Sequence, residues 1–133
     1  MIDVQSELYT IGREAIITDY PETEVSSTYN LQPSKFPFAS IVEIDNSVYT
    51  PTSDSARVEN HANITLEVQI YTTGANKQSE ARGILSSLDE KYGGIGLTRM
   101  MSSPVTNLND TNVYRLVARY RGIISINKEI YRR

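Results

Sequence analysis

The sequence predicts an α+β fold, a mainly antiparallel β-sheet of about four strands with two α-helices packed on one face. Residues 3–17 and 77–92 carry apolar side chains at helical spacing. Four other segments are strand-like, with alternating or β-branched and aromatic side chains: 38–45, 62–71, 97–103 and 112–126. A length of 133 residues suits one hydrophobic core, so we expect a single domain over residues 1–133.

The first helix is predicted from a stripe that begins behind Asp3, a candidate N-cap residue, and it should end before Pro21. The stripe consists of Val4, Leu8, Ile11 and Ala15. Residues 21–37 are rich in Ser, Thr, Pro and Asn, which indicates an irregular connection with at most one short extended piece. After the strand at 38–45, the polar stretch 46–60 is typical of a long surface loop.

The strand at 62–71 has the clearest alternation, with one apolar face for the core and one polar face. The second helix, 77–92, should end at Gly93 as its C-terminal cap. The short connection 104–111 between the last two strands predicts an antiparallel hairpin.

Composition narrows the classes of function. The net charge of −3 provides no whole-molecule attraction for nucleic acid or an anionic membrane. With no cysteine, the chain has no disulfide or thiol chemistry and suits a reducing cytoplasm. No apolar run approaches the ~20 residues of a membrane helix, so we expect a soluble protein with no membrane partner.

Motifs for catalysis are weak. His61 is the only histidine, and it stands in no metal-ligand spacing and beside no Gly-x-Ser-x-Gly turn. The glycines of residues 93–96 follow a helix, the reverse of the order in a phosphate-binding loop. Asp89 and Glu90 diverge on a helix and are interpreted as a solvated face. We therefore expect no catalytic residue, cofactor site or metal site.

The last strand carries the most informative pattern. Arg115, Arg119 and Arg121 share one face, and the more apolar opposite face is assigned to the helices. Three interpretations stay open for the arginines. They could be solvated, with Glu67 or Glu43 as cross-strand partners at roughly 0.2–1 kcal/mol each. They could meet a neighbouring subunit, or they could contact passing nucleic acid.

The order of motifs over residues 36–133 resembles the tail terminators and other small tail-completion (head–tail joining) proteins of long-tailed bacteriophages. The resemblance includes residues 57–63 at the entry to the alternating strand, the following helix and a closing segment. The closing segment carries Leu97-Thr98-Arg99, Pro104, Asn107, Asp110-Thr111, Tyr114-Arg115, Arg119-Tyr120 and Ile130-Tyr131-Arg132-Arg133. Residues 1–35 share only a leading helix with these proteins.

The resemblance implies a virion protein of the tail–neck region that is assembled in the host cytoplasm. Its homo-oligomeric ring, typically of six subunits, would cap the tail tube, stop tube polymerisation and dock the head connector. Partners would be the tube and connector proteins, with DNA passing through the channel without specific binding. Candidate interface residues are Arg115, Arg119, Arg121 and Glu67 on the strands, with Tyr49 and Arg57 from the long loop.

Three alternatives remain. One is a generic nucleic-acid-binding module, which the arginine face supports and the acidic balance of the chain opposes. A head-completion or connector protein of the phage neck would be equally small and equally poor in catalytic motifs. A more distant alternative is a metal-dependent enzyme whose Asp and Glu ligands converge from separate segments.

Overall fold

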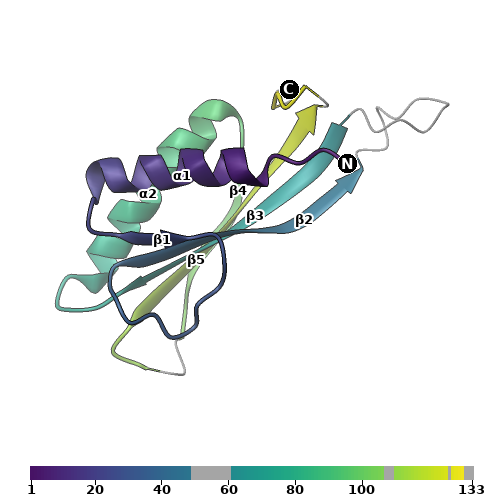
Figure 1. Cartoon of the computed structure of the whole chain (residues 1–133). Helices are drawn as coiled ribbons and strands as arrows, with labels where there is room; N and C mark the ends of the chain where they lie inside the picture. The colour runs from purple at the N-terminus through teal and green to yellow at the C-terminus, as the bar shows by residue number, and fades with distance from the viewer. Residues whose placement is uncertain (49–60, 107–109, 126, 131–133) are drawn as a thin grey trace.

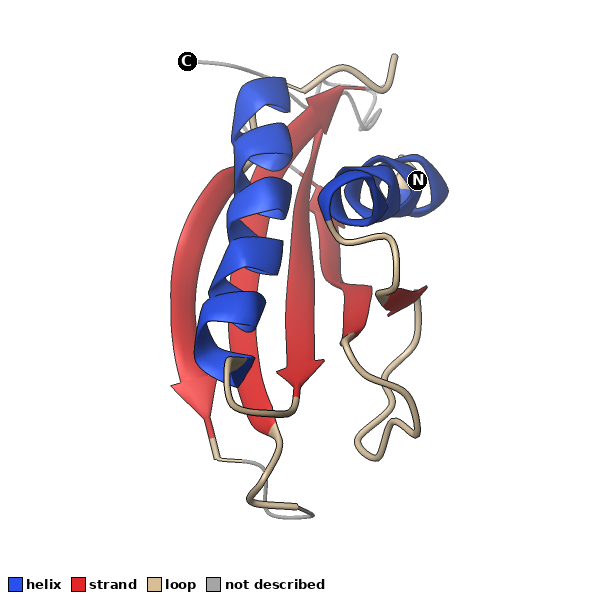
Figure 2. Cartoon of the chain, turned by 90° about the vertical axis from the view of Figure 1, so that its left-hand side faces the viewer, coloured by secondary structure: helices blue, strands red, loops and turns tan. Residues whose placement is uncertain are grey.

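The α+β architecture is confirmed in a computed structural model, which describes residues 1–48, 61–106, 110–125 and 127–130. The described elements run in the order α1 (Gln5–Asp19), β1 (Glu24–Ser26), β2 (Phe38–Val48), β3 (His61–Thr72), α2 (Lys77–Ile95), β4 (Thr98–Val105) and β5 (Tyr114–Ser125). Both helices lie on the same face of the sheet (Figure 1). Figure 2 shows α2 running along the strands, whereas α1 is seen almost end-on.

The sheet has five strands in the order β1-β2-β3-β5-β4, one more than the sequence predicted. The additional strand is β1, which pairs in parallel with the first three residues of β2. It is the short extended piece expected within residues 21–37, and three residues are too few to show an alternating pattern. All other pairings are antiparallel, including the predicted hairpin of β4 and β5.

The main core lies between the helices and the even-numbered residues of β3. Ile64, Leu66, Val68 and Ile70 are at most 1% exposed. They belong to one cluster with Leu8 and Ile16 of α1, Ile84 and Leu88 of α2, and Leu116, Ala118 and Tyr120 of β5. The alternation in β3 and the apolar face of β5 were therefore predicted correctly.

One end of each helix differs from the prediction: the start of α1 and the end of α2. The N-cap position of α1 is Val4, which makes no side-chain capping bond, and Asp3 Oδ1 accepts the N–H of Gln5 at a long 3.4 Å. The second helix continues through Gly93 to Ile95 and ends at Gly96, whose φ of 107° is left-handed. At this end, the Leu97 N–H donates to the Tyr92 carbonyl at 2.9 Å. A glycine can serve as a cap only where the chain has to turn, and that point is Gly96.

The buried stripe of α1 is Leu8, Gly12 and Ile16, rotated from the stripe predicted. The rotation brings Gly12 against Tyr92 of α2, whose hydroxyl donates to the Leu8 carbonyl at 2.7 Å. A Cβ at Gly12 would collide with the Tyr92 hydroxyl and with Ile41 of β2. The absence of a side chain at Gly12 therefore permits the close approach of α1 to α2 and the sheet.

We expect Gly12→Ala to lower the free energy of unfolding by about 1–3 kcal/mol, because the added methyl group overpacks a filled site. The matched control is Gly93→Ala, where no atom lies within 4 Å of a new Cβ. This control should raise stability by about 0.5–1 kcal/mol through helix propensity. Urea unfolding of the two variants and the parent measures both effects, and equal stabilities would contradict the packing argument.

Candidate functional site

The candidate site lies on the sheet face turned away from α1 and α2, which we call the open face. Glu67, Gln69 and Tyr71 of β3 lie on it, and the register pairs Glu67 with Arg119 and Tyr71 with Arg115. Arg121 is paired with Thr65 on the same face. The structure thus places all three arginines on one face, as the alternation predicted.

Part of the open face is covered by residues 27–37, which we call the strap. The Tyr29 hydroxyl donates to Glu67 Oε1 at 2.9 Å, and Phe36 packs against Phe38, Tyr71 and Val113. As a result, Glu67, Gln69 and Tyr71 are only 8%, 4% and 1% exposed. This face of β3 carries polar side chains, as predicted, but the strap packs on it and buries them.

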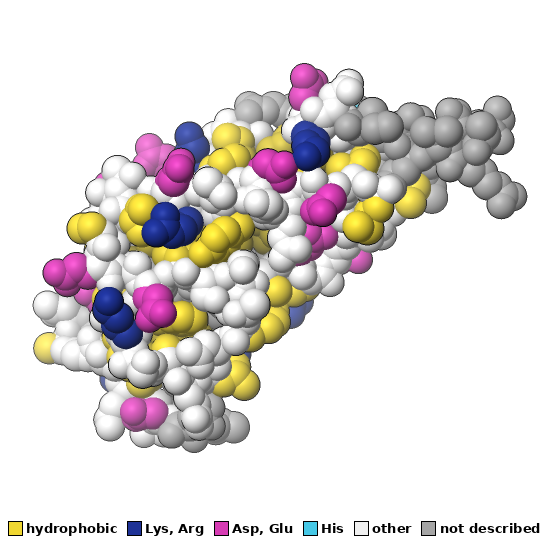
Figure 3. All heavy atoms as spheres, viewed as in Figure 1, with side chains coloured by type: hydrophobic (Ala, Val, Ile, Leu, Met, Phe, Trp, Pro, Cys, Tyr) yellow, Lys and Arg dark blue, Asp and Glu magenta, His cyan; other side chains and the backbone are white. Residues whose placement is uncertain are grey.

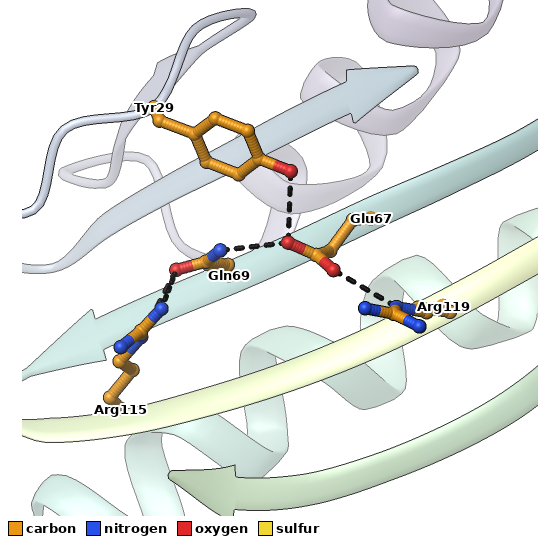
Figure 4. Close-up of polar contacts among 5 residues, drawn as sticks. All are labelled: Tyr29, Glu67, Gln69, Arg115 and Arg119. Carbon is orange, nitrogen blue, oxygen red and sulfur yellow. Dashed lines mark hydrogen bonds and ion pairs between the residues drawn. The ribbon is translucent and has the colours of Figure 1, made fainter. Parts of the chain in front are cut away.

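The buried polar side chains form one hydrogen-bonded network (Figure 4). Glu67 accepts bonds from Tyr29 and from Gln69 Nε2 on Oε1, and from Arg119 Nε on Oε2, each at 2.9 Å. Gln69 Oε1 in turn accepts the Tyr71 hydroxyl at 2.9 Å. We call this network the Glu67 ladder. Each of its buried polar groups has a hydrogen-bond partner, as burial requires.

Arg115 and Arg121 are held by amides and not by carboxylates. Arg115 donates from Nε and Nη2 to Gln69 Oε1 at 3.0 and 2.8 Å, and its guanidinium lies 5.7 Å from the centre of the Tyr71 ring. Arg121 Nη2 donates to Asn63 Oδ1 at 3.0 Å. Of these three arginines, only Arg119 forms an ion pair with a described carboxylate, the predicted one of Glu67.

The alternative partner, Glu43, does not reach the arginines. It is on β2, which is separated from β5 by β3, and its register partner Leu66 faces the helices. The other two predicted candidates, Tyr49 and Arg57, lie outside the described residues. Tyr29 was not among the predicted site residues. It stands in a polar segment, where its aromatic side chain was the available signal.

The network sets the ionisation of Glu67 and Tyr29. Burial alone would raise the pKa of Glu67, but the bonds from Gln69, Tyr29 and Arg119 and the charge of Arg119 outweigh it, so the pKa lies below its ordinary value. Burial and the bond to Glu67 raise the pKa of Tyr29 to about 12. At neutral pH the ladder therefore contains a carboxylate and a protonated phenol.

Glu90 is exposed, as predicted, but Asp89 is only partly exposed and has partners. It accepts the Tyr120 hydroxyl at 2.8 Å and pairs with Arg99 at 3.2 Å, so it joins α2 to β5 and β4. His61 is half-buried at the start of β3. Within the described ranges, no group of three or more His, Asp or Glu side chains is arranged to hold a metal ion.

No protein-family model matches the chain, and no curated protein matches it in sequence. None of the helices in the described part of the structure is long and apolar enough to cross a membrane.

The pKa of Glu67 predicts a pH dependence of folding. Because the folded-state pKa is lowered, the ladder contributes stability above the ordinary pKa of 4.5 and loses it as pH falls through the folded value. Glu67→Gln should therefore be less stable than the parent at pH 7, and the difference should shrink on acidification. Urea unfolding of both proteins at pH 7 and at successively lower pH measures this difference in stability. A difference that does not change with pH would contradict an ionised Glu67 in the ladder.

Glu43 supplies the matched control of opposite sign. Burial, together with Asp3 and Asp45, raises the pKa of Glu43, so its ionised form disfavours folding at neutral pH. Glu43→Gln should then be more stable than the parent at pH 7 and equal to it at low pH.

Proposed function

We propose that the chain is a structural virion protein of a long-tailed bacteriophage, a tail terminator that acts by assembly and not by catalysis. Its homo-oligomeric ring, of six subunits, caps the tail tube, stops polymerisation and offers the docking surface for the head connector. The ring belongs to the tail–neck region of the virion and is assembled in the host cytoplasm. The open face supplies one contact surface.

The observation that carries this proposal is the surplus of positive charge on the open face. Arg115 and Arg121 have no carboxylate partner among the described residues, and hydrogen bonds to Gln69 and Asn63 hold both guanidinium groups. Arginine's planar fork suits carboxylates of a second protein, and arginine is enriched in protein interfaces. Two guanidinium groups that are held in place and have no carboxylate partner favour an acidic protein partner.

The segments that resemble tail-completion proteins also support the open face as a contact surface. Leu97-Thr98-Arg99 begins β4, and both Tyr114-Arg115 and Arg119-Tyr120 belong to β5. The segment that most resembles the tail-completion proteins is thus the hairpin that carries the arginines. Passing DNA would meet the same charges, and its retention would fall steeply with added salt.

The direct test is electron microscopy of lysates from a phage whose copy of this reading frame is truncated. We expect headless tails of abnormal length beside DNA-filled heads. Normal-length free tails with leaking or unattached heads would instead identify a head-completion or connector protein. Normal virions would contradict both assignments.

Arg121→Glu should prevent complementation of that truncated phage, because it reverses one of the two uncompensated charges. The Arg121 side chain is exposed, and among the described residues it bonds only to Asn63, so the substitution spares the Glu67 ladder. Arg13 is an exposed residue of α1, so Arg13→Glu makes the same charge change elsewhere and should complement normally. Circular dichroism checks that both variants fold, and equal phage titres would argue against the open face as a contact surface.

A further inference from the structure

Two strands leave a long edge of the sheet unpaired within the described residues. β1 covers only residues 38–40 of β2, so residues 41–48 have no strand beside them. β4 is the strand at the other edge and is also eight residues long. An unpaired edge presents a row of backbone N–H and C=O groups to a further strand.

Each of these edges projects an apolar side chain at a bulge. The register of β2 shifts between Glu43 and Asp45, and Ile44 at this shift is 41% exposed. The register of β4 shifts between Arg99 and Met101, and Met100 at this shift is 55% exposed. Bulges re-aim side chains, so both edges turn a large apolar group outward.

The β2 edge is acidic on the side of the helices. Glu43 lies there, because its register partner is the core residue Leu66. Asp3, at the start of the chain, and Asp45 are close enough for their carboxylates to raise the pKa of Glu43, although burial is the larger cause. Figure 3 shows acidic side chains gathered over this end of β2. Asp45 itself is paired with Thr65 and so lies toward the open face, which leaves Glu43 and Asp3 as the carboxylates on the helix side. These two carboxylates favour a cationic neighbour.

The β4 edge is basic on the same side of the sheet. A groove of about 250 Å³ between α2 and β4 is lined by Arg82 and Arg99, with Ser86, Ser102 and Ser103 among the other lining residues. Arg99 is paired with Asp89, but the Arg82 side chain makes no ion pair or hydrogen bond with any residue that the structure describes. The groove therefore offers an uncompensated guanidinium and several hydroxyl groups to an acidic strand.

We propose that a second copy of this chain docks its β2 edge on the β4 edge, so that the sheet continues from one subunit to the next. In this pairing, Glu43 and Asp3 of one subunit lie beside Arg82 and Arg99 of the other. This inference rests on the proposed ring and assigns the two surfaces that build it.

The strand directions fit this pairing. β2 and β5 run the same way, because each is antiparallel to β3, and β4 is antiparallel to β5. A second copy added in the same orientation therefore brings its β2 antiparallel to β4, with the helices of both copies on the same side. The contact uses two different surfaces of the subunit, which is the arrangement that generates cyclic rings.

Bulges and Pro104 are also devices that protect an edge strand from pairing. Protection alone, however, needs no opposite charge on the other edge. The acidic and basic edges therefore favour docking over mere protection.

A charge-swap experiment tests the pairing. Arg82→Glu and Glu43→Lys should each raise the dissociation constant of self-association about tenfold or more, because each places like charges at the contact. Mixed in equal amounts, the two variants should associate as the parent does. Where the variants alternate, the β4 edge of Arg82→Glu meets the β2 edge of Glu43→Lys, and the other edges keep the parent residues. Sedimentation velocity measures the species, and Arg13→Glu should behave like the parent.

Circular dichroism decides whether Glu43→Lys folds, and Asp3→Lys replaces it if it does not, because Asp3 is exposed. Three outcomes would overturn the edge pairing: both single variants associate normally, the mixture stays dissociated, or the parent is monomeric at all soluble concentrations. Overlong tails from the truncated phage combined with normal association of Arg82→Glu would reject the edges but keep the ring. A successful charge swap with normal tails from the truncated phage would reject the function but keep the edges.

Discussion

The carboxylate of Glu67 is the group on which the arrangement of the open face depends. It lies on the middle strand and is 8% exposed, and a buried carboxylate is tolerated only when hydrogen bonds replace its water. Its donors come from three segments: Tyr29 of the strap, Gln69 of β3 and Arg119 of β5. Satisfying this one group therefore positions the strap and orients a guanidinium on the neighbouring strand.

The same network explains why the arginines suit a contact surface. Arg115 is held by two bonds to Gln69 and lies over Tyr71, so less side-chain entropy remains to be lost when a partner binds. Glu67 is already bonded to Arg119, which leaves the charges of Arg115 and Arg121 uncompensated within the described residues. The face is thus ordered, and it carries two guanidinium groups with no carboxylate partner among the described residues.

Periodicity predicted the elements that pack against many neighbours. The alternation in β3, the stripe of α2 and the two faces of β5 each follow from burial repeated at a regular interval. The sequence did not reveal the strap, because Tyr29 and Phe36 become informative only once β3 is known to lie beneath them. The cap of α2 at Gly96 instead of Gly93 depends on where the chain has to turn toward β4. Likewise, Arg82 and Arg99 meet across a groove that exists only because α2 packs beside β4.

A head-to-tail sheet can close into a ring or continue as an open filament, and the rotation between neighbouring subunits decides which of them forms. A constant rotation requires a sheet that does not change its twist when a partner binds. The central strands of this sheet are fixed on one face by the helices and on the other by the strap and the Glu67 ladder. In the proposed ring, the buried carboxylate would then act at a distance from the contact edges. By holding the twist of β3 and β5, it would favour closure at one subunit number over continued growth.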